Sequence, residues 1–202
     1  MTYESAVLKY INPKRKEVTH MTEPIWISLR KNFDHTREFG EVPLIRSYTQ
    51  PEITISQLDL RPTAKSLVLV HGFNCDYEAV NESYLALYGM LAIAGVIESF
   101  NRIAFLMWPG GENGFLSWPF ASSRANRSGQ SLPLELCTAE STWITHSMGA
   151  RVALQMLQRK DVAGIENLIL MAPAVDDEEI CDGGEFAGIG EKAKRILVCH
   201  SA

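Results

Sequence analysis

The sequence predicts an α/β fold: a three-layer sandwich in which helices cover both faces of a mostly parallel central sheet. The run at residues 66–70 is apolar almost without interruption, as is typical of a strand buried on both faces of a parallel sheet. From there on, strand-like runs alternate with helical periodicity, which implies right-handed crossovers between parallel strands. A length of 202 residues suits one domain with one substantial core.

The chain divides into a leading segment, residues 1–60, and the main part of the same single domain, residues 61–202. Short β-prone runs in the leading segment are separated by Pro, Asn and Asp, which favour turns. We expect its strands at residues 6–11, 24–29, 42–48 and 52–58.

The main part begins with the strand at residues 66–70. A long helix follows, which Asp76 can cap. Its apolar positions keep helical spacing at Val80, Tyr84, Leu87, Tyr88 and Leu91. Later strands are expected at 102–107, 141–145, 166–171 and 195–199, and helices at 122–137, interrupted by Pro133, and at 148–158.

Composition excludes several classes of partner. The net charge of −5 leaves no basic footprint for nucleic acid. The longest apolar stretch, residues 85–97, is too short to span a membrane, and the N-terminus lacks the features of a signal peptide. The cysteines lack paired spacing, which favours reduced thiols in the cytoplasm over disulfides or a zinc site. They are Cys75, Cys137, Cys181 and Cys199.

One strand end carries Thr145-His146-Ser147-Met148-Gly149, and a helix follows at once. This is the pattern of a nucleophile elbow, a tight turn that exposes a serine hydroxyl at the carboxyl edge of the sheet. Gly149 provides the small residue that the close backbone approach requires. Ser147 could instead be a simple helix N-cap, but the strand before it and the small-residue helix after it favour a nucleophile.

A second strand end carries Val70-His71-Gly72-Phe73-Asn74. Acyl transfer needs backbone N–H donors directed at the developing oxyanion. We expect one donor from Met148, the residue after the nucleophile, and the other from Phe73. For the side chain of His71 we favour a structural role within this loop. The glycine-rich stretch at residues 183–190 is predicted to be a flexible loop.

The chain resembles the α/β-hydrolase superfamily in residues 69–74, in Trp108-Pro109-Gly110-Gly111 and in residues 145–149. It is most similar to a bacterial branch that combines H-G-[FY]-N, W-P and H-S-M-G. The resemblance covers residue 66 to the C-terminus and implies a serine hydrolase of carboxylesterase type. Such an enzyme cleaves an ester or related acyl bond of a small molecule through an acyl-enzyme on Ser147, without cofactor or metal. Thr145 departs from the pattern because a glycine is usual there.

The superfamily order is nucleophile, acid, histidine. The acid normally follows the strand that here lies at 195–199, so the resemblance implies that acid and histidine lie beyond Ala202. We therefore expect a fold incomplete at its C-terminus and an inactive chain. Asp176 is an alternative acid, although its spacing to Glu179 favours a capping box. No histidine is a convincing base: His146 should point away from the site, and His200 lies where the acid is expected.

Two other functions remain open at this stage. One is a non-catalytic binding protein that keeps the α/β-hydrolase fold, and the other is an acyltransferase with an acceptor other than water. Trp108 and Trp118 flank the segment after the strand at 102–107, where they either line an acyl pocket or cover the sheet edge.

Overall fold

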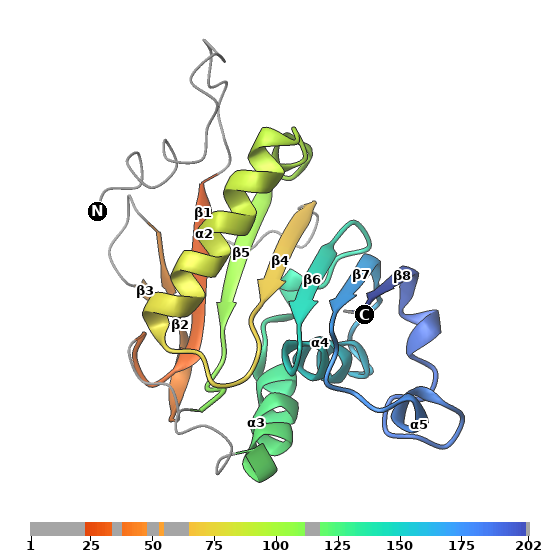
Figure 1. Ribbon diagram of the computed structural model, residues 1–202. Helices are drawn as coiled ribbons and strands as arrows, with labels where there is room; N and C mark the ends of the chain where they lie inside the picture. Colours follow the sequence, from red (N-terminus) through yellow and green to blue (C-terminus); the bar gives the residue numbers. More distant parts are fainter. Residues whose placement is uncertain (1–22, 34–37, 48–52, 55–64, 112–117, 201–202) are drawn as a thin grey trace.

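The computed structural model describes residues 23–33, 38–47, 53–54, 65–111 and 118–200 (Figure 1). They form an eight-stranded sheet in the order β3-β2-β1-β5-β4-β6-β7-β8. The six strands β1, β5, β4, β6, β7 and β8 are adjacent in this order and all run parallel. Strand β2 pairs antiparallel with both β1 and β3. The strands are β1 Pro24–Arg30, β2 Phe39–Arg46, β3 Ile53–Thr54, β4 Ser66–Val70, β5 Arg102–Met107, β6 Thr142–His146, β7 Ile165–Met171 and β8 Ala193–Cys199.

Helices cover both faces of the sheet, which confirms the predicted three-layer α/β architecture. Helix α2 lies on one face, and α3 and α4 lie on the other (Figure 1). Along β4, Leu67 and Leu69 pack on the α2 side while Val68 and Val70 pack on the opposite side. The helical elements are α2 Tyr77–Ile93, α3 Trp118–Ser131, α4 Gly149–Leu157 and α5 Asp177–Ile180, with 3₁₀ turns at Ile97–Ser99, Leu134–Leu136 and Ile189–Glu191.

Most predicted elements of the main part are confirmed within one or two residues. The carboxylate of Asp76 caps α2 by accepting a hydrogen bond from the Ala79 N–H at 2.8 Å. The helix predicted at 122–137 differs: it begins earlier, at Trp118, and ends at Ser131. It stops before Pro133 because proline disfavours helical angles in the residue that precedes it.

The leading segment is described only in part. The strands predicted at 24–29 and 42–48 correspond to β1 and β2. Of the predicted strand at 52–58, β3 is the described part. The strand predicted at 6–11 lies outside the described residues.

The chain crosses the sheet in two directions from β4. It passes through α2 to β5 on one side of β4, then returns through α3 to β6 on the other side. The ends of β4 and β6 are therefore neighbours, with Val70 opposite Thr145. Ligand sites in open α/β sheets lie at such switch points, where two loops diverge at the carboxyl edge.

The glycine-rich stretch after α5, predicted to be a flexible loop, is an irregular segment that side-chain packing anchors at Phe186. Phe186 within it is fully buried, and the guanidinium of Arg151 on α4 lies 5.0 Å from its ring centroid. The same guanidinium pairs with Glu179 and, at 2.6 Å, with Glu185. This stretch therefore covers α4. Within the described residues, no helix is both long enough and apolar enough to cross a membrane.

Replacing Gly149 with alanine is expected to lower the free energy of unfolding by about 1–3 kcal/mol. A Cβ at this position would collide with the carbonyl oxygen of His71 and lie 2.8 Å from that of Val70. Urea unfolding measures the difference. Gly190→Ala is the matched control, because nothing lies within 4 Å of its added Cβ. Equal unfolding midpoints for the Gly149 variant and the wild type would contradict the expectation.

Candidate active site

Ser147 lies in the turn between β6 and α4, in the left-handed region of backbone space with φ 51°. Its N–H donates to the carbonyl of Met171 at 3.0 Å, so the end of β7 holds the turn. Its own carbonyl accepts from the N–H groups of Ala150 and Ala174, both at 3.1 Å. Positive φ is uncommon for a non-glycine residue, and here the surrounding hydrogen bonds maintain it.

Thr145 occupies the position where the superfamily usually has glycine. Its side chain is buried at 1% exposure, and its hydroxyl donates to the carbonyl of Ile169 at 3.4 Å. The larger residue is accommodated because it points into the interior rather than into the turn.

The loop after β4 packs directly against the elbow. A Cβ added at Gly72 would lie 2.9 Å from Nδ1 of His146 and 3.2 Å from Cβ of Ser147. In the described part of the chain, the N–H groups of Phe73 and Met148 have no hydrogen-bond partner. Two unengaged amides therefore lie in the two segments that adjoin the serine.

His71 holds this loop through both ring nitrogens. Its Nδ1–H donates to the Gly72 carbonyl at 2.6 Å, and its Nε2 accepts from the N–H of Trp108 at 3.2 Å. The imidazole stacks on the Trp108 indole, with ring centroids 5.5 Å apart. This is the structural role that the sequence favoured. Trp108 is itself fully buried beneath the loop, so it does not line an open pocket.

Two further residues position the loop, and sequence analysis missed both. The buried guanidinium of Arg30 donates to the carbonyl of Trp108 at 3.1 Å and to that of Cys75 at 3.0 Å. The hydroxyl of Tyr84 accepts from the His71 N–H at 2.7 Å and donates to the Leu106 carbonyl at 2.5 Å. The available signal was a tyrosine on the buried face of a helix, because a buried phenol needs a partner.

The electrostatic environment keeps His71 neutral. Burial lowers its pKa to about 3, and the positive charge of Arg30 acts in the same direction. The nearby Cys75 thiol is half-buried and donates to the Phe73 carbonyl at 3.3 Å. Burial raises its pKa, which disfavours the thiolate. Neither group is suited to act as base or nucleophile at neutral pH.

Asp176 caps α5, and the predicted capping box is confirmed. The Glu179 carboxylate accepts from the Asp176 N–H at 3.1 Å, and the Glu179 N–H in turn donates to the main-chain carbonyl of Asp176 at 3.1 Å. The alternative role of Asp176 as a catalytic acid stays a prediction.

No nucleophile–base pair is assembled among the described residues. Within them, Oγ of Ser147 has no hydrogen-bond partner, so no imidazole bonds to it. His146 and His200 are both exposed, and His20 and His35 lie outside the described residues. In the same ranges, no group of three His, Cys, Asp or Glu side chains could hold a metal ion.

A largely apolar cavity of about 330 Å³ adjoins the elbow on the α2 side of the sheet. The strand ends contribute Gly72, His146 and Met171, and α2 contributes Leu87 and Met90. Pockets for small molecules start at about this size. At the loop after β4, Trp118 packs edge-on against Phe73, with ring centroids 5.3 Å apart.

A mostly parallel sheet with a strained serine turn at its switch point defines an α/β hydrolase. Residues 48–202 match the family described as alpha/beta hydrolase of unknown function (DUF900). The chain belongs to this family. No curated protein and no solved structure matches the chain.

We predict that folding stability decreases as the pH falls from about 6.5 toward 3, in part because of His71. The imidazole stays neutral in the folded protein but takes up a proton in the unfolded chain, so acid favours unfolding. Between pH 7 and pH 5 this single group contributes a loss of about 2 kcal/mol. Urea unfolding at both pH values, compared with His71→Asn, measures the contribution.

A readout that does not depend on the variant's folding is the NMR titration of the imidazole. The His71 resonances should stay at their neutral positions from pH 8 to pH 5. A titration midpoint between pH 6 and 7 would contradict the buried, neutral imidazole.

Proposed function

We propose that this protein is a serine hydrolase that cleaves an ester or related acyl bond through an acyl-enzyme on Ser147. The backbone of Ser147 carries the proposal. An ordinary N-cap residue has extended backbone angles, whereas Ser147 has φ 51°. Such strain costs on the order of 1–3 kcal/mol and gathers at functional sites.

In the proposed reaction, Oγ of Ser147 attacks the carbonyl carbon of the substrate and the C=O π electrons move to the oxygen. The amides of Phe73 and Met148 stabilise the oxyanion, and their unengaged N–H groups support this role. Collapse of the tetrahedral intermediate expels the alcohol and leaves the acyl-enzyme, which water then hydrolyses.

The base that takes the proton from Oγ is proposed to be a histidine, oriented by a carboxylate, as the superfamily resemblance implies. Asp176 is kept as the alternative acid. The apolar lining of the cavity beside the elbow supports an apolar acyl group in the substrate. A cytoplasmic location is part of the proposal, and its support is that all four cysteines are free thiols.

The first test is labelling with a fluorophosphonate probe, which reacts covalently with an activated serine. We expect slow labelling of the wild type and none of Ser147→Ala, because Ser147 carries the reacting oxygen. Mass spectrometry of the labelled peptide identifies the site.

Ser99→Ala is the matched control, because Ser99 is an exposed serine of the turn before β5, at the opposite edge of the sheet. This variant should label like the wild type. Labelling that survives in Ser147→Ala would refute the assignment. A folded wild type that never labels would favour a non-catalytic binding protein.

The second test is turnover of a short-chain activated ester by residues 1–202. We expect kcat several orders of magnitude below the ordinary enzymatic range of about 1–10³ s⁻¹. The reason is that no imidazole bonds to Oγ of Ser147 within the described residues. Removal of a triad member lowers kcat by several orders of magnitude. Rapid Ser147-dependent turnover would contradict this. His146→Gln and His200→Gln would then identify the missed base.

A further inference from the structure

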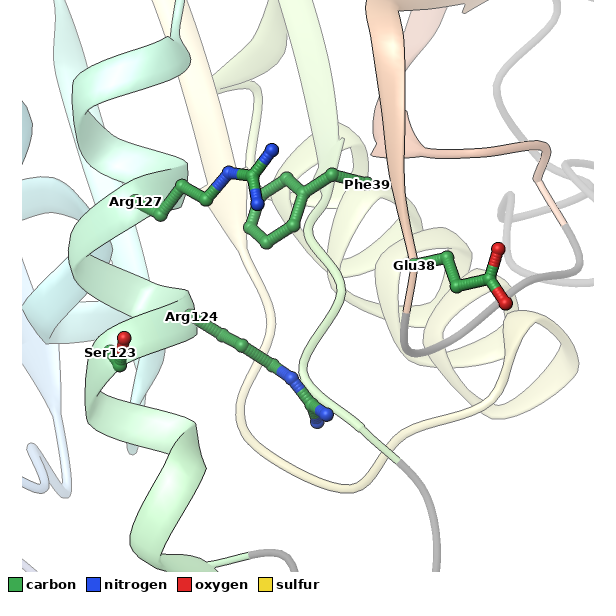
Figure 2. A pocket seen from close by; sticks show the side chains of 5 residues that line it. All are labelled: Glu38, Phe39, Ser123, Arg124 and Arg127. Atoms are coloured by element: carbon green, nitrogen blue, oxygen red, sulfur yellow. The ribbon is translucent and has the colours of Figure 1, made fainter.

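A second cavity, of about 420 Å³, opens between α3 and the start of β2 (Figure 2). Two arginines from α3, Arg124 and Arg127, line it together with Ser123, Glu38 and Phe39. Its volume lies within the range of small-molecule sites. Its lining is more polar than that of the cavity beside the elbow.

Arg124 extends its side chain into this space (Figure 2). One of its terminal nitrogens, Nη1, is shielded from solvent and has no hydrogen-bond partner among the described residues. A guanidinium carries five N–H donors and keeps its charge. Arg124 is partly buried, and the shielded N–H lies at the wall of a cavity, where an acceptor that enters the cavity can satisfy it.

Arg127 lies three residues further along α3, on the same side of the helix. Its guanidinium carbon is 4.1 Å from the centroid of the Phe39 ring, a cation–π contact that orients the group toward β2. This contact uses the flat face of the guanidinium and leaves its N–H edge available for an acceptor.

Glu38 does not neutralise these two charges. Its carboxylate forms an ion pair with Lys31 at 2.9 Å, and the pairing raises the pKa of Lys31. In Figure 2 the carboxylate points away from both guanidinium groups. Among the residues that line the cavity, Glu38 is the one acid, so the field inside the cavity favours an anion.

We propose that this cavity binds the phosphate group of a small molecule. Arg124 would donate two parallel N–H bonds to the phosphate oxygens, a geometry that suits guanidinium and phosphate. Arg127 supplies the second positive charge, and Ser123 a neutral hydroxyl donor. Two guanidinium groups balance the charge of a phosphomonoester, about −1.5 to −2 at neutral pH.

This site is separate from Ser147. It lies on the α3 side of the sheet, whereas the cavity beside the elbow lies on the α2 side, and the two cavities share no lining residue. The proposal therefore does not rest on the hydrolase activity, and its test needs no turnover.

The test is calorimetric titration of the protein with inorganic phosphate and with glycerol 3-phosphate, at constant ionic strength. We expect binding of both and a raised thermal midpoint at saturation. Arg124→Gln should weaken binding at least about tenfold. Arg124→Lys, which keeps the charge but loses the fork, should give an intermediate Kd.

Lys65→Gln is the charge-matched control, because Lys65 is exposed and precedes β4 at the opposite edge of the sheet. This variant should bind phosphate with the affinity of the wild type. Thermal unfolding of each variant checks that it is folded. Equal affinity for both ligands indicates a site for phosphate itself, and tighter binding of the ester indicates a phosphorylated metabolite. Absence of binding, or equal weakening in Arg124→Gln and Lys65→Gln, would overturn the proposal.

Discussion

The site depends on close packing between the loop after β4 and the turn after β6. Gly149 lets α4 begin directly against the carbonyl oxygens of Val70 and His71. Gly72 lets the loop lie against Ser147. A Cβ at Gly149 would push the two backbones apart, and one at Gly72 would press on the His146 ring and on Cβ of Ser147. Because a protein interior is close-packed, neighbouring residues can move little to make room. The positions of the Ser147 turn and of the adjoining amides therefore depend on glycine at residues 72 and 149.

A buried polar network keeps the loop in that contact. Arg30, His71 and Tyr84 are all buried, and each bonds to backbone groups of the loop or of the strand beside it. Hydrogen bonds in such a buried setting are stronger than exposed ones because the local dielectric constant is low. Burial fixes the His71 side chain within the loop and also lowers its pKa, so the imidazole stays neutral. The histidine nearest the predicted oxyanion loop is therefore a structural residue.

The two proposals share a physical basis, which is an N–H donor without an acceptor. The amides of Phe73 and Met148 are neutral and adjoin a hydroxyl, which suits an oxyanion that exists only during reaction. The guanidinium of Arg124 is permanently charged and faces a cavity of about 420 Å³, which suits an anion that stays bound. The surroundings of each donor, rather than its residue type alone, distinguish transient stabilisation of an oxyanion from stable binding of an anion.

The sequence by itself determined the fold class, most helix and strand positions, the cap at Asp76 and the capping box at Asp176. These follow from local periodicity and from short-range hydrogen bonding, which the order of residues encodes directly. Only the tertiary structure decided the strand order, the supporting roles of Arg30 and Tyr84, and the packed state of the glycine-rich stretch. Those depend on contacts between residues far apart in the chain, such as Arg30 with Trp108 and Arg151 with Glu185. Periodicity shows which face of an element is buried but not which partner buries it.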